Sequence, residues 1–178
     1  RDGVNGIVSI IGGKLTTSRH MAEQTVDTVG KLLGKKRACS TKSAFLLGAA
    51  GYDPQAILAS GGLSAHLGER YGAEARFVSD IIDDNPALQT PIIDGLPYTE
   101  AEVVYAIRHE LACNIDDILS RRLRARLMAR DASADAAQRV GELLQQELNL
   151  DPAAVARQVA DYQTTVQREK AILMGTSA

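Results

Sequence analysis

The apolar residues near the start of the chain form a short continuous run, whereas those further on recur at helical spacing. The run 7–11 consists of β-branched residues interrupted only by Ser9, which predicts a buried strand. Gly12 and Gly13 follow and favour a tight turn with a close backbone approach. Residues 17–33 then carry apolar side chains at helical spacing, so this region predicts a strand, a turn and a helix.

The remainder of the chain carries helix signals. Asp53-Pro54 and Asp151-Pro152 each place a capping side chain before a proline at the first helical position. Thr99 and Glu102 have the spacing of a capping box ahead of an apolar run. We therefore expect helices from Asp53-Pro54 to about Gly61 and over 64–70, 74–84, 99–112, 115–129, 132–148 and 152–173.

A polar, basic stretch from Lys35 to Ser43 is the best candidate for a linker. It divides the chain into residues 1–35 and residues 36–178. Because a single strand cannot form a sheet, residues 1–35 are predicted to be the terminal strand, turn and helix of a larger α/β domain. Residues 36–178 are predicted to be an all-helical, bundle-like domain, so the fold class is mainly α. The first residue is Arg1 rather than Met, and we expect an excised domain.

Composition excludes several classes of protein and site. The two cysteines, Cys39 and Cys113, form no disulfide or zinc pattern, and reduced thiols favour a cytoplasmic location. The histidines His20, His66 and His109 have no metal-ligand spacing, so no metal site is predicted. No apolar run approaches the roughly 18 residues that a membrane span requires.

The charges around the glycine turn suggest a binding site. Lys14 and Arg19 are basic, and no acidic residue occurs before Glu23. The helix start therefore leaves its free N–H groups available to an anion or a carbonyl oxygen. The turn is not a phosphate-binding P-loop, because Val8 and Leu15 stand where that motif needs Gly and Ser or Thr. A plain strand-to-helix connection with an exposed lysine remains the alternative.

The expected helix over 115–129 carries four arginines, which are Arg121, Arg122, Arg124 and Arg126. Its apolar stripe consists of Ile115, Leu119, Leu123 and Leu127. Arg122 and Arg126 lie beside this stripe, so we expect them to be partly buried and paired with Glu102 or Glu110. The other two arginines should be solvated. A nucleic-acid interface is the weakest interpretation, because the net charge is −2 and aromatic residues are only 4%.

Two stretches resemble FAD-dependent glycerol-3-phosphate dehydrogenases. GIVSIIGGKLTTSRHMAEQTVD at residues 6–27 resembles the end of the family's FAD domain. Residues 95–127 resemble its C-terminal helical domain, which reads A-E-x-x-Y-A-x-x-x-E and then D-x-L-x-R-R-x-R. The matching positions are Ala101, Glu102, Tyr105, Ala106, Glu110, Asp117, Leu119, Arg121, Arg122 and Arg124.

The resemblance implies oxidation of sn-glycerol 3-phosphate to dihydroxyacetone phosphate by FAD, with electrons passing to a quinone at the inner face of the cytoplasmic membrane. It places six residues against the flavin, namely Gly12, Gly13, Lys14, Leu15, Thr16 and Thr17. Lys14 would be catalytic, holding the phosphate or polarising the reacting oxygen. Position 18 is Ser where many relatives have Tyr, so the resemblance does not carry over an aromatic contact there.

The sequence contains no G-x-G-x-x-G dinucleotide-binding motif. We therefore expect the fragment alone to bind no FAD and to be inactive, with the rest of the FAD domain as its partner. The alternative is an autonomous helical module for protein interaction or homo-oligomer formation.

Overall fold

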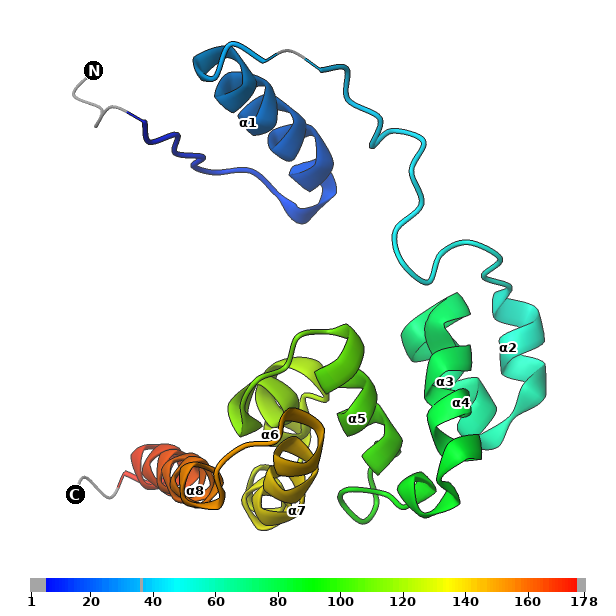
Figure 1. The fold of residues 1–178 in the computed structure, drawn as a ribbon, viewed down its shortest axis with the longest axis vertical. Coiled ribbons are helices and arrows are strands. Elements are labelled where there is room, and N and C mark those ends of the chain that lie inside the picture. The colour runs from blue at the N-terminus through cyan, green and yellow to red at the C-terminus, as the bar shows by residue number, and fades with distance from the viewer. Residues whose placement is uncertain (1–5, 36, 176–178) are drawn as a thin grey trace. The chain divides into compact units, whose positions relative to one another are not determined.

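The computed structural model of the protein describes residues 6–35 and 37–175 (Figure 1). Across these two ranges the only β-pairing is an isolated antiparallel bridge between Pro91 and Thr99, and the rest is helix and loop. The prediction of a mainly α fold is confirmed. The strand predicted over 7–11 is wrong: Ile7, Ile10 and Ile11 lie in an irregular segment and are 64%, 51% and 93% exposed. A strand needs a partner strand, and the described residues supply none.

The chain divides into two compact units, Arg1–Leu47 and Gly48–Ala178. The first unit contains the short helix η1 (Leu15–Thr17) and helix α1 (Ser18–Leu32). Helix α1 confirms the helix that the sequence predicts over 17–33. The division of the first unit from the second falls twelve residues beyond the boundary placed at 35/36. The assignment of residues 1–35 to an FAD domain stays a prediction.

The second unit is built from consecutive helices (Figure 1). In chain order they are α2 (Pro54–Ser60), α3 (Gly62–Tyr71), η2 (Gly72–Glu74), α4 (Ala75–Asp84), η3 (Pro86–Gln89), α5 (Glu100–His109), η4 (Asp117–Arg122), α6 (Ala125–Met128), α7 (Arg130–Leu148) and α8 (Pro152–Leu173). The capping predictions are confirmed for α2 and α5. Asp53 accepts bonds from the first turn of α2, and Thr99 and Glu102 form the reciprocal capping box of α5. Asp151 precedes α8 without a side-chain cap.

Helices α7 and α8 pack closely because the contact face of α7 contains a glycine. A Cβ atom at Gly141 would lie only 2.9 Å from Val155 Cγ1 and 3.2 Å from Val159 Cγ2. Val140 and Val166 are fully buried in the same core. Any larger residue at position 141 would push α8 away from α7.

The helix predicted over 115–129 is not continuous. Residues Asp117–Arg122 form a π-helical turn, and Arg124 then adopts a left-handed conformation with φ of 59° before α6 begins. Leu119 and Leu123 are fully buried, as predicted, but Leu127 is 79% exposed. The wide π turn and the reversal at Arg124 change the register, so the apolar stripe ends at Leu123.

Candidate functional site

The glycine turn of the first unit has a defined backbone. Gly12 and Gly13 have φ values of 85° and 96°, a region that non-glycine residues rarely adopt. Lys14 is extended and forms the N-cap of η1. Its backbone N–H donates to Thr17 Oγ1 at 3.1 Å, and Thr17 Oγ1 donates to the Lys14 carbonyl oxygen at 3.0 Å. These bonds fix the chain direction where the turn becomes a helix.

An open pocket of about 560 Å³ lies against this turn. Ile10, Gly12 and Lys14 line it from the turn, and Ser18 and Met21 line it from α1. Nothing lies within 4 Å of the position that a Cβ atom would take at Gly12. The backbone at Gly12 is therefore open to a flat molecule resting on it.

Of the two basic residues that the sequence places near the turn, Lys14 and Arg19, only Lys14 keeps the predicted position. Neither η1 nor α1 carries an acidic residue in its first turn. Arg19, however, is drawn away from the turn: its Nη1 lies 2.8 Å from Glu23 Oε2 and 3.2 Å from Thr41 Oγ1. The hydrogen bond from Arg19 lowers the pKa of Glu23. Lys14 is the cation that remains exposed at the turn.

These residues fit a flavin ring. The first N–H groups of a helix have no partner within the helix, and no carboxylate in the first turn competes for them. A ring carbonyl oxygen could accept from these groups, and Gly12 lacks the side chain that would hold the ring away. The sequence-predicted group Gly12, Gly13, Lys14, Leu15, Thr16 and Thr17 is thus contiguous and exposed around one turn.

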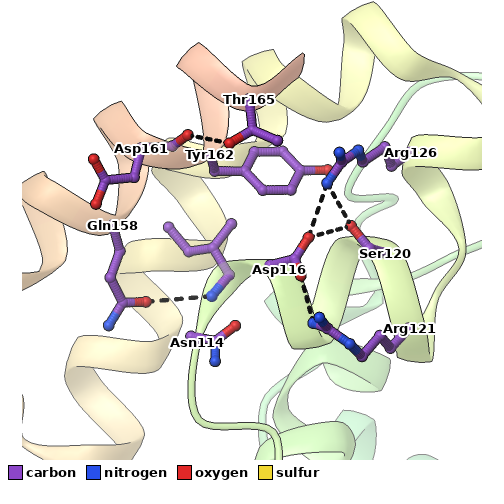
Figure 2. A pocket seen from close by; sticks show the side chains of 10 residues that line it. Asn114, Asp116, Ser120, Arg121, Arg126, Gln158, Asp161, Tyr162 and Thr165 are labelled. Carbon is purple, nitrogen blue, oxygen red and sulfur yellow. Dashed lines mark hydrogen bonds and ion pairs between the residues drawn. The ribbon is translucent and has the colours of Figure 1, made fainter. Parts of the chain in front are cut away.

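A second pocket of about 650 Å³ lies in the helical unit, between α8 and the segment 114–126 (Figure 2). The side chain of Arg126 is only 16% exposed and contacts residues on both sides of the pocket. Its Nη1 lies 2.9 Å from Asp116 Oδ1, and its Nε and Nη2 donate to the Glu169 carboxylate. The Arg126 guanidinium also lies over the Tyr162 ring, 5.7 Å from the centroid. The positive charge of Arg126 is thus paired with carboxylates of this chain, and these pairs join α8 to the segment 114–126.

Asp116 is the centre of that cluster (Figure 2). Burial alone would raise the pKa of Asp116. The hydrogen bond from Ser120 and the positive charges of Arg121 and Arg126 outweigh burial, so the pKa of Asp116 is lowered. The ionised carboxylate is therefore the form that the folded protein stabilises.

The arginine pairs were predicted in part. Arg122 lies 3.8 Å from the Glu110 carboxylate and donates to the Glu110 carbonyl oxygen at 2.6 Å, which confirms that pair. Arg126 instead pairs with Asp116 and Glu169, because the reversal at Arg124 turns it toward α8. Arg121 and Arg124 are exposed, as predicted.

The sequence analysis missed the polar cluster around Glu102. This carboxylate has no exposed surface, and it accepts from the Thr99 backbone N–H at 2.7 Å. His66 Nε2 lies 3.0 Å and Arg70 Nε 3.3 Å from its other oxygen, so it pairs with α3 and not with Arg122 or Arg126. Tyr71 donates to the same oxygen at 3.1 Å. The capping box was the only local signal for Glu102, since its partners lie more than thirty residues away.

No group of His, Cys, Asp or Glu residues that could hold a metal ion occurs in the ranges 6–35 and 37–175. Within the same described part of the chain, no helix is long and apolar enough to cross a membrane.

Comparison with known proteins identifies the family to which the chain is similar. The family model described as the C-terminal domain of alpha-glycerophosphate oxidase matches residues 39–155. Glycerol-3-phosphate dehydrogenase 1 of Mycobacterium tuberculosis is 39% identical over 128 residues, covering 71% of this chain and 25% of that protein. Glycerol-3-phosphate dehydrogenase 2 of the same organism is 33% identical over 174 residues, covering 92% of this chain and 30% of that protein.

A eukaryotic relative is also similar. The mitochondrial glycerol-3-phosphate dehydrogenase of Mesocricetus auratus is 35% identical over 157 residues, covering 82% of this chain and 22% of that protein. The chain thus spans between about a fifth and a third of the length of these three relatives. No solved structure matches it.

Proposed function

Because the chain belongs to the family defined by the C-terminal domain of alpha-glycerophosphate oxidase, we propose that it is the C-terminal part of an enzyme that oxidises sn-glycerol 3-phosphate to dihydroxyacetone phosphate. FAD, when bound, supplies the acceptor for the two electrons of this oxidation. The chain contributes residues 12–17 to the flavin site, and the segment that precedes them in the relatives contributes the rest.

The observation that carries this proposal is the geometry of the glycine turn. Gly12 leaves open space above its backbone, and the start of η1 presents N–H groups without an acidic neighbour. Such a helix start stabilises negative charge that develops on a ring bound against it. Lys14 is exposed beside it and supplies the cation that holds the substrate phosphate or polarises the reacting oxygen.

The remaining parts of the proposal concern partners. The exposed side chains of Ile7, Ile10 and Ile11 are apolar, and we assign their covering to the rest of the FAD domain. The electron acceptor is a quinone, reached by peripheral attachment of the enzyme at the inner face of the cytoplasmic membrane. The helical unit has its own hydrophobic core and forms a separate domain of the enzyme. Its alternative role is homo-oligomer formation.

Replacement of Lys14 in the full-length enzyme tests the catalytic part. Lys14→Met should lower kcat by about 10²-fold, since a cation near developing charge contributes about 3 kcal/mol to the transition state. Lys31→Met, on the exposed last turn of α1, is the matched control and should leave turnover unchanged. Wild-type kinetics in Lys14→Met would remove Lys14 from the site and leave only the backbone role of the turn.

Flavin retention tests the division of labour between this chain and the preceding segment. The 178-residue chain, mixed with FAD and dialysed, should lose the yellow flavin absorption, because the dinucleotide-binding motif is missing from its sequence. The same chain extended through the preceding domain should retain it. Stoichiometric flavin on the 178-residue chain would contradict the proposal.

A further inference from the structure

The glycine turn packs against Met21 of α1, which also lines the open pocket and which the resemblance does not include among the flavin contacts. A Cβ atom at Gly13 would overlap Met21 Sδ and would lie 2.5 Å from Met21 Cε. The thioether therefore occupies the space that any side chain at position 13 would need. Two features therefore require glycine at position 13: its φ of 96°, and the sulfur of Met21, which leaves no room for a Cβ atom.

The same sulfur atom also reaches the cap of the helix. Thr17 Oγ1 lies 3.5 Å from Met21 Sδ, one helical turn away. That hydroxyl group is the one that accepts from the Lys14 N–H and lies 3.0 Å from the Lys14 carbonyl oxygen. One side chain thus touches both ends of the turn, at Gly13 and at Thr17, and Lys14 lies between them.

We propose that Met21 is a positioning residue, whose thioether holds the Gly13 backbone and the Thr17 hydroxyl so that Lys14 and the helix start face the flavin. This inference rests on the proposed function for its catalytic consequence, but not for the support of the turn itself. Methionine suits the role because it is unbranched, flexible and polarisable, so its sulfur fits against both Gly13 and the Thr17 hydroxyl group. Leucine would fill part of the same space without the polarisable sulfur atom.

The support of the turn is measured on the 178-residue chain without flavin, by amide hydrogen exchange at Lys14 and Thr17. Both amides are hydrogen-bonded within the turn, Lys14 to Thr17 Oγ1 and Thr17 to the Lys14 carbonyl oxygen. Met21→Ala should accelerate the exchange of both, and Met21→Leu should accelerate it less. Val29→Ala, a truncation further along α1, should leave it unchanged. Wild-type exchange in Met21→Ala overturns the inference.

The contact with Gly13 is isolated by a double-mutant cycle. Gly13→Ala introduces strain at positive φ and a clash with Met21, and adding Met21→Ala removes the clash but leaves the strain. The strain at φ is common to the single and the double variant, so it cancels in the cycle. Gly13→Ala should therefore accelerate exchange less in the Met21→Ala background than in the wild type. Strictly additive effects would overturn the proposed contact.

The catalytic consequence is measured on the full-length flavoprotein. Met21→Ala should shift the visible flavin spectrum and lower kcat by up to about 10²-fold while KM changes little, and Met21→Leu should restore part of kcat. Faster exchange together with an unchanged spectrum and kcat would show that the turn does not face the flavin. That outcome overturns the proposed function of the turn and the catalytic half of the inference, and it is distinct from unchanged exchange.

Discussion

Arg126 should be the arginine of this region on which stability depends most. Its guanidinium donates to Asp116 and Glu169, contacts Ser120 Oγ at 3.3 Å and lies over Tyr162, with only 16% of the side chain exposed. Arg126→Ala would break all of these contacts and separate the α6 segment from α8.

The size of the effect follows from the exposure of the partners. Removing one member of a fully buried ion pair costs about 3–5 kcal/mol, because the other charge is left without compensation. Asp116 and Glu169 are 36% and 43% exposed, so water can replace part of the lost interaction. We therefore expect Arg126→Ala to lower the free energy of unfolding by about 2 kcal/mol.

Urea unfolding followed by far-ultraviolet circular dichroism measures this change. Arg121→Ala is the matched control, because Arg121 contacts the same Asp116 carboxylate but is 56% exposed. It should cost less than about 1 kcal/mol. If Arg121→Ala proves as costly as Arg126→Ala, or if Arg126→Ala is neutral, the assigned role of the buried guanidinium is wrong.

Three further predictions use the same unfolding assay. Leu123→Ala should cost about 3 kcal/mol, since Leu123 is fully buried, whereas Leu127→Ala at a 79% exposed position should cost under about 0.5 kcal/mol. Arg124→Gly should stabilise by roughly 0.5 kcal/mol, because relief of the left-handed backbone outweighs the added flexibility of glycine when unfolded. Because the pKa of Asp116 is lowered from its ordinary value of 3.8, the ionised carboxylate stabilises the folded protein above that pH, and this stability is lost on acidification. Asp116→Asn should therefore flatten the fall of the urea midpoint below pH 5.

The sequence was most informative where a helix begins, because caps act within one turn. Asp53 and the Thr99–Glu102 capping box both start helices at the predicted positions. It was least informative where the structure depends on distant groups. The run 7–11 has the composition of a strand, but strand formation depends on a partner, and the described residues contain none. The partners of Glu102 on α3, His66 and Arg70, were equally invisible to local patterns.

The turn that carries the candidate site was predictable from local residues, whereas the position of one of its two basic side chains was not. Two glycines before a helix start without acidic residues are a local signal, and the structure keeps them together around one turn. The position of Arg19 depended instead on Glu23, four residues away on the same helix, and on Thr41. The role of Met21 could not be read from the sequence, because its apolar spacing is equally typical of an ordinary core position.

The reversal at Arg124 shows why the predicted helix over 115–129 failed although no glycine or proline interrupts it. A continuous α-helix would have directed Leu127 to the core with Leu123. In the structure Ala125 is fully buried instead, and Arg126 reaches Asp116 and Glu169. A left-handed residue costs about 1–2 kcal/mol, which is comparable to the free energy that Arg126 contributes by pairing with α8. The break therefore exchanges the burial of one leucine for an ion-paired link between α6 and α8, and this exchange depends on Glu169, more than forty residues away.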